Sequence, residues 1–124
     1  MQTLTQPRES AAAQRTTGRV AVLYTSAHTV LPDIARLLEL ASVREALDPA
    51  APTALKVNIS WQRYYPACST SPWQLDGTIR GLRRAGYRDL VAVQNGTVVV
   101  DSHEGERRNK HLGVLKRHGV PSVH

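Results

Sequence analysis

Five polar side chains between residues 56 and 70 are of types that could bind a small anion together. They are Lys56, Asn58, Arg63, Ser69 and Thr70. Ammonium and guanidinium groups neutralise negative charge, and amide and hydroxyl groups donate hydrogen bonds. Pro72, preceded by hydroxyl residues, predicts a helix that starts directly after them. Because helix N-termini favour negative charge, the pattern predicts a phosphate or carboxylate site, with Arg63 as a mobile clamp and no catalytic residue assigned.

The stretch Ala54–Gly86 contains the strand, loop and helix that must position these side chains. Alternation of apolar and polar residues predicts a strand, and its apolar members are Leu55, Val57 and Ile59. Lys56 and Asn58 therefore share one face. Residues Trp61–Ser71 lack any period and indicate a loop. The following helix has an apolar stripe and ends at Gly86; the stripe consists of Leu75, Ile79 and Leu82.

A structural interpretation of the same residues stays open. Ser69 and Thr70 could serve only as helix caps, Lys56 could extend into solvent, and Asn58 could satisfy the loop backbone. The sequence does not decide between capping and ligand binding.

The N-terminal part of the chain predicts a tail, a strand and a helix. Residues 1–17 are polar and without period, so we expect a disordered tail. Arg19–Thr25 is apolar on both faces, which predicts a first strand covered on both sides. A helix should run from Pro32 to about Leu47, and Asp48–Pro52 should be a linker.

The C-terminal part predicts one more strand and a last helix. Leu90–Val93 is a short apolar run typical of a buried strand. Thr97–Val100 could pair with it as a hairpin across Asn95 and Gly96, or form an irregular extended segment. The last helix should run from Glu104 to His118 and stop at Gly119.

Alternating strands and helices predict an α/β fold: a mostly parallel sheet of three to four strands with flanking helices, in a single domain of residues 18–124. Such a sheet is thin. Its open edges and the wide apolar surface of the helix after Pro32 suggest an incomplete doubly wound domain. A homo-oligomer or a missing half of the domain would then complete it.

The composition allows a second class of function. The chain has 41% hydrophobic residues, typical of a globular protein, and a formal net charge of +6. Arginines at 80, 83, 84 and 88, with the aromatic residues of the 61–65 loop, could bind nucleic acid without catalysis. A solvated helix face is the preferred explanation for the arginines, and no nucleic-acid motif is found.

Other candidate chemistry is weaker, and we expect no metal and no cofactor. The single cysteine, Cys68, excludes an internal disulfide; it precedes a helix N-terminus but lacks an evident base partner. His111 and His118 are too far apart along a helix to share an ion, and the cluster of Asp101, His103 and Glu104 matches no ligand spacing.

No apolar run is long enough to cross a bilayer and no apolar secretory segment is found, so we expect a cytoplasmic location without a membrane partner.

The chain from about Arg19 onward resembles the family called domain of unknown function 362. Members have a strand with a Lys-x-Asn signature, a Thr or Ser and a Pro that open a helix, and a Gly-terminated turn; here these are Lys56, Asn58, Thr70, Pro72 and Gly86. A later stretch is similar to a subgroup of the family in Glu104, Gly105, Asn109, Lys110, Leu115 and Gly119.

The resemblance implies a longer domain that is truncated at its C-terminus in this chain, with a further basic and threonine-containing segment beyond residue 124. Some members carry cysteine-rich iron–sulfur segments, and with Cys68 alone this chain departs from that pattern. Since the family has no settled activity, the resemblance names no substrate.

Overall fold

The computed structural model describes residues 18 and 20–124. The predicted tail, residues 1–17, lies outside the described residues. The elements, in chain order, are α1 (Val30–Leu40), α2 (Val43–Ala46), β1 (Thr53–Lys56), α3 (Pro72–Arg84), β2 (Leu90–Val93), α4 (Ser102–Arg108), α5 (His111–His118) and β3 (Ser122–Val123).

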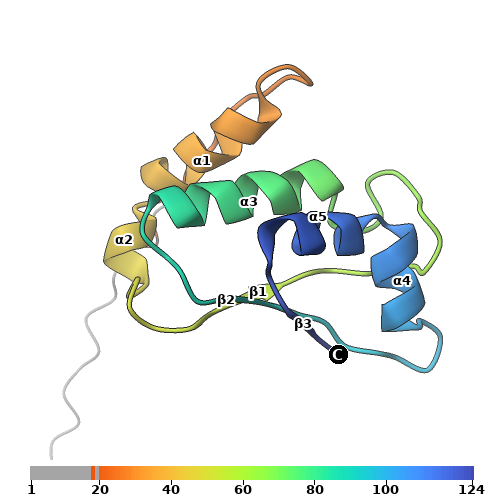
Figure 1. The fold of residues 1–124 in the computed structure, drawn as a ribbon. Helices are drawn as coiled ribbons and strands as arrows, with labels where there is room; N and C mark the ends of the chain where they lie inside the picture. Colours follow the sequence, from red (N-terminus) through yellow and green to blue (C-terminus); the bar gives the residue numbers. More distant parts are fainter. Residues whose placement is uncertain (1–17, 19) are drawn as a thin grey trace, which may run out of the picture.

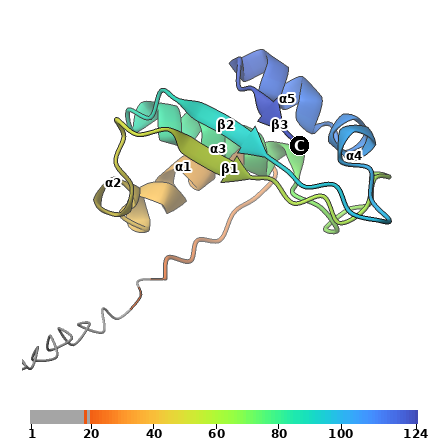
Figure 2. The same cartoon turned by 90° about the horizontal axis from the view of Figure 1, so that it is seen from below.

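The three strands form one parallel sheet in the order β1-β2-β3 (Figure 2). Thr53 pairs with Leu90, and Val93 lies between Lys56 on one side and Val123 on the other. Helices α3 and α5 lie over one face of this sheet (Figure 1). The prediction of a mixed α/β fold with a mostly parallel sheet is confirmed.

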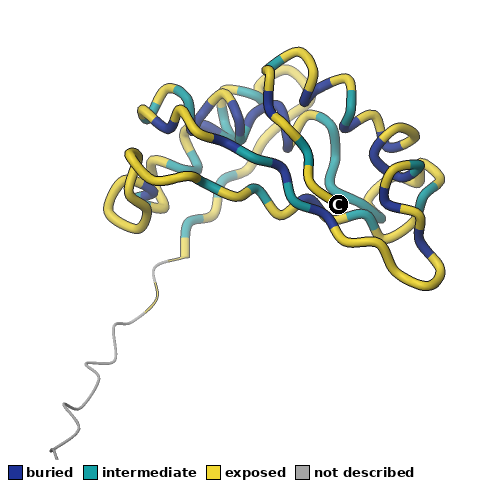
Figure 3. Tube along the Cα trace, turned by 60° about the horizontal axis from the view of Figure 1, so that its bottom comes forward, coloured by how far each residue is buried: buried dark blue, intermediate teal, exposed yellow. Residues whose placement is uncertain are grey.

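Burial along the strands identifies the face that the helices cover. In β2, Leu90 and Ala92 are buried, whereas Val91 and Val93 are only half-buried (Figure 3). Because side chains alternate between the faces of a strand, Leu90 and Ala92 point toward the helices. The core between sheet and helices contains Val57, Leu75, Ile79, Leu82, Tyr87 and Leu115.

Helix α1 packs against α3 and makes few contacts with the sheet. Two glycines of α3 allow the close approach. A Cβ atom at Gly77 would lie 2.8 Å from Ile34 Cδ1, and one at Gly81 would lie 3.0 Å from Ala35 Cα. Only Ala35 of α1 is buried, so the wide apolar surface predicted for this helix stays partly open, and Leu40 is exposed.

The predicted first strand, Arg19–Thr25, is wrong for the residues that the structure describes. Residues 20–25 belong to no strand, and Val20 and Tyr24 are 84% and 96% exposed. The apolar run shows a preference for extended backbone, but a strand also needs a hydrogen-bonding neighbour. Because α1 packs on α3, the segment before α1 does not pair with β1, the edge strand of the sheet.

Both long predicted helices are interrupted. The predicted helix from Pro32 to Leu47 ends at Leu40, and α2 begins after Ser42, whose φ of 56° is left-handed. The predicted helix from Glu104 to His118 is split into α4 and α5 at Lys110, whose φ is 67°. Neither is glycine, so neither break is marked by the residue that most often adopts this conformation.

The sheet also differs from prediction at its C-terminal edge. Thr97–Val100 forms no strand, and the Thr97 amide donates to Val100 O at 3.1 Å. The segment is therefore irregular and does not form a hairpin with Leu90–Val93. The third strand is β3, which follows α5 and continues the βαβ order. Its two residues are too few for a periodic signal.

None of the helices in the described residues combines the length and apolarity needed to cross a membrane.

Candidate functional site

The structure places Lys56 and Asn58 on the face of the sheet opposite the helices. Burial alternates along this strand and its continuation: Leu55 is half-buried, Val57 is buried, and Lys56 and Asn58 are exposed. The two side chains share a face, as the sequence predicts, but that face does not point to the start of α3. The Lys56 ammonium contacts Val57 O at 3.4 Å, and Asn58 Nδ2 donates to Ser60 Oγ at 2.8 Å.

The hydroxyl groups of Ser69 and Thr70 hold the loop closed. Thr70 Oγ1 accepts from the Asn58 amide at 3.0 Å, and the Thr70 amide donates to Asn58 O at 2.9 Å. Ser69 Oγ accepts from the Ser60 amide at 3.2 Å. The cap of α3 is Ser71, whose Oγ accepts from the Gln74 amide at 3.3 Å. Ser69 and Thr70 therefore fix the loop to the end of the β1 segment.

The remaining predicted side chains of this loop lie at its surface. Arg63 is exposed and makes no hydrogen bond or ion pair with any residue that the structure describes. Cys68 is half-buried, and its amide donates to Tyr65 O at 3.2 Å. Arg63 is thus free to reach a ligand, as a clamp requires.

A groove of about 410 Å³ lies beside the first turn of α3. Pro72 and Trp73 line it from α3, and Lys110 and Arg117 line it from the start and the last turn of α5. The Lys110 ammonium lies 4.8 Å from the centre of the Tyr64 ring. This contact places the loop residue Tyr64 beside the groove. The Trp73 amide has no acceptor among the described residues, since Pro72 and Trp73 precede the first intrahelical bonds. Two cations and a free amide therefore border one depression.

One buried carboxylate, Asp76, also lines this groove, and its charge is compensated. His118 Nε2 lies 2.6 Å and Arg80 Nε 2.8 Å from Asp76 Oδ1, and Arg117 lies 3.9 Å from Oδ2. Burial opposes ionisation of this carboxyl, but the hydrogen bonds from Arg80 and His118 outweigh it and hold the pKa of Asp76 below its usual range. The charged side chains that line the groove are Lys110, Arg117 and Asp76, so the lining carries more positive than negative charge.

His111 fastens α5 to the residue before the α3 cap. It is completely buried, and its Nε2 lies 2.6 Å from Thr70 O. Since a carbonyl can only accept, Nε2 carries the proton; Nδ1 is buried and has no partner in the described structure. Burial lowers the pKa of His111, against the smaller opposing effect of the Thr70 carbonyl. Protonation at Nδ1 would bury a second N–H without an acceptor.

We predict that acidification weakens the fold through His111. The neutral form is favoured in the folded state, so below the ordinary pKa of 6.5 the unfolded chain binds more protons. The contribution of His111 is complete above about pH 6.5 and is lost as the pH falls toward the lower, folded-state pKa. Denaturant unfolding at several pH values between about 7.5 and 5.5 should show this loss. His111→Gln keeps a donor for Thr70 O and does not titrate, so it should lose less stability over this range; an unchanged pH dependence would contradict the assignment.

A second buried polar cluster surrounds Glu106, where β2 and β3 end. Glu106 Oε2 accepts from Gln94 Nε2 at 3.2 Å and from Ser122 Oγ at 2.8 Å, and lies 2.6 Å from His124 Nε2. Ser102 Oγ lies 2.9 Å from the other ring nitrogen of His124. These contacts join β2, α4 and β3, and their first role is to hold the C-terminal edge of the sheet together.

Sequence reasoning missed Trp73, Lys110 and Arg117 as site residues. The spacing of Lys110 and Arg117 contains a usable signal, because residues seven apart lie on one face of a helix. Nothing in the spacing of the chain indicates that this face lies beside α3.

The described residues contain no group of three or more His, Cys, Asp or Glu side chains arranged to hold a metal ion. No protein-family model matches this chain, and neither a curated protein nor a solved structure matches it. The resemblance to the domain of unknown function 362 family therefore stays a prediction.

Proposed function

We propose that this domain binds a small phosphorylated or carboxylate ligand in the groove between the first turn of α3 and helix α5. The observation that carries the proposal is the position of Lys110 and Arg117, which line this groove from the N-cap and the last turn of α5. The ammonium and guanidinium groups neutralise the anion, and the free amide of Trp73 at the positive end of α3 donates to it.

Ser69 and Thr70 support this site by fixing the loop, whereas the sequence suggests that they contact the ligand. Ser69 and Thr70 close the loop against the β1 segment, and His111 holds Thr70 next to α5. The loop and α5 are thereby positioned together beside the start of α3. Arg63 can approach an anion from the loop, whereas Lys56 and Asn58 lie on the other face of the sheet.

The proposal predicts that removing the charge of Lys110 or of Arg117 weakens phosphate binding, whereas removing the charge of Lys56 does not. We expect inorganic phosphate and pyrophosphate, titrated calorimetrically at low salt, to bind about tenfold or more weakly to Lys110→Ala and to Arg117→Ala than to the unaltered chain. A hydrogen bond to a charged group contributes about 1.5–3 kcal/mol, and about 1.4 kcal/mol corresponds to a factor of ten.

Lys56→Ala is the matched control, because it removes the same charge from the opposite face. Its affinity for phosphate should be nearly unchanged. Equal losses in Lys56→Ala and Lys110→Ala would mean that phosphate responds to net charge only, and an absence of binding to the unaltered chain would refute the proposal.

A nucleic-acid-binding module is the second candidate, and one observation favours it. Arg80, Arg83, Arg84 and His118 line a separate depression of about 370 Å³. Two of these arginines are already engaged, since Arg80 pairs with Asp76 and Arg83 Nη2 donates to His118 O at 2.8 Å. A single-stranded oligonucleotide that depends on Arg84 and loses affinity steeply with salt would support this candidate over the anion groove.

A further inference from the structure

A larger groove lies next to the anion groove. It measures about 660 Å³, within the range of pockets that hold small organic ligands. Trp73 and Leu31 line both grooves, so the two depressions adjoin at these two side chains. A ligand bound at Lys110 and Arg117 could therefore extend into the larger groove without leaving the surface.

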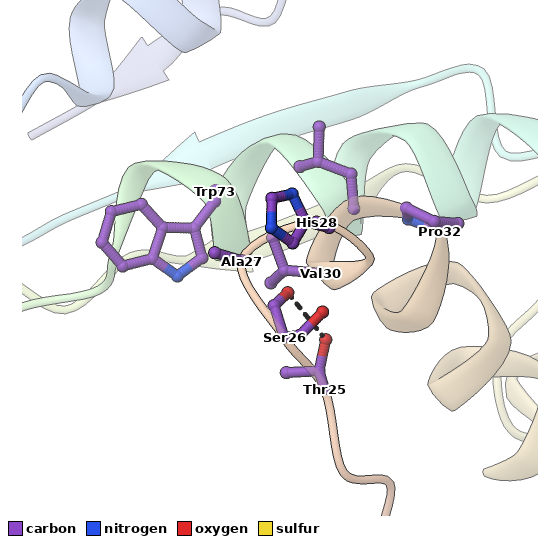
Figure 4. A pocket seen from close by; sticks show the side chains of 8 residues that line it. Thr25, Ser26, Ala27, His28, Val30, Pro32 and Trp73 are labelled. Carbon is purple, nitrogen blue, oxygen red and sulfur yellow. Dashed lines mark hydrogen bonds between the residues drawn. The ribbon is translucent and has the colours of Figure 1, made fainter.

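The walls of the larger groove are mainly apolar and include an aromatic ring. Ala27, Val30 and Pro32 line it from the segment around the start of α1, and Trp73 lines it from the first turn of α3 (Figure 4). Trp73 is 49% exposed. A half-exposed indole beside an apolar surface offers a planar face on which another ring can stack.

The polar groups of this groove are largely engaged with one another. Thr25 Oγ1 donates to Asp33 Oδ2 at 2.8 Å, and Ser26 Oγ lies 3.0 Å from Thr29 Oγ1. These bonds fix the turn before α1 and leave few hydroxyl donors for a ligand. The imidazole of His28 is different: it is exposed and makes no hydrogen bond or ion pair with the part of the chain that the structure describes. It is available to a polar edge of a bound ring.

We propose that the larger groove binds the planar aromatic ring of a ligand whose anionic group lies at Lys110 and Arg117. The ligand class is an aromatic phosphomonoester of the size of a nucleoside monophosphate. Trp73 stacks on the ring and separates the ring subsite from the anion subsite. This inference rests on the proposed function, because it assigns the second half of the ligand to the same site.

The test compares AMP with ribose 5-phosphate, which carries the same phosphate but no base. We expect AMP to bind at least about fivefold more tightly, because stacking of a base on an aromatic side chain is measurable at this scale. Trp73→Ala should remove this preference and leave ribose 5-phosphate binding nearly unchanged, and Trp73→Phe should keep part of it. Trp61→Ala, which alters the other tryptophan of the chain, should keep all of it.

The outcomes separate this inference from the proposed function. If ribose 5-phosphate binds in a Lys110-dependent way and AMP binds no better, the aromatic subsite is refuted and the anion site stands. A preference for AMP that persists in Trp73→Ala would also refute the subsite. If neither compound binds, both proposals are refuted.

Discussion

Replacing Tyr87 by alanine should lower the free energy of unfolding by about 3–5 kcal/mol, the range for aromatic-to-alanine changes in cores. Tyr87 is completely buried and belongs to the core between the sheet and α3. Its removal leaves a cavity that the surrounding strands and helices cannot fill. Chemical denaturation monitored by circular dichroism measures the loss.

Tyr87→Phe separates the ring from the hydroxyl. The hydroxyl lies 3.0 Å from Val43 O and 2.8 Å from Leu47 O, and so it fastens α2 to the core. Without the hydroxyl, the two carbonyls lose a hydrogen-bond donor, and the free energy of unfolding should fall by about 1 kcal/mol. If phenylalanine destabilised the fold as much as alanine does, the packing account of Tyr87 would be wrong.

The second large effect is expected at Gly105 of α4. A Cβ atom there would lie inside the contact distance of Ile59 Cγ2, on the segment that continues β1. Ile59 is branched next to its backbone and cannot swing away, so Gly105→Ala should destabilise the fold by about 1–3 kcal/mol. Thermal and denaturant unfolding provide the measurement.

Gly113 of α5 is the control for helix propensity. Among the described residues, no atom beyond the chain neighbours and the backbone of α5 lies within 4 Å of a Cβ atom built there, so Gly113→Ala should raise stability, by up to about 1 kcal/mol. The same substitution is thus expected to act in opposite directions in two neighbouring helices. Stabilisation by both alanines would show that α4 does not pack closely on Ile59.

The sequence predicted the elements whose signals are local. The apolar stripe of α3, its proline at the start and the short run of β2 all lie in stretches where periodicity and capping agree. The predicted strand at Arg19–Thr25 has an equally strong local signal, yet residues 20–25 belong to no strand of the described structure. Pairing depends on where α1 packs, and that is a long-range property.

The candidate site shows the same limit. The alternation around Leu55 and Val57 correctly puts Lys56 and Asn58 on one face, but the sequence does not say which face the helices cover. The left-handed turn at Lys110 changes the direction of the last helix and brings Arg117 to the side of α3. A break at a non-glycine residue has no reliable local signal, so these cations could not be assigned to the site in advance.

The measurement that tests the central claim most directly is a titration of the isotopically labelled chain with inorganic phosphate, followed through its backbone amide resonances. The account predicts that the largest shifts occur at Trp73 and Gln74 and around Lys110, and that the amides of Lys56 and Asn58 shift little. Shifts confined to the Arg80–Arg84 surface, or to the face that carries Lys56, would contradict a site between α3 and α5.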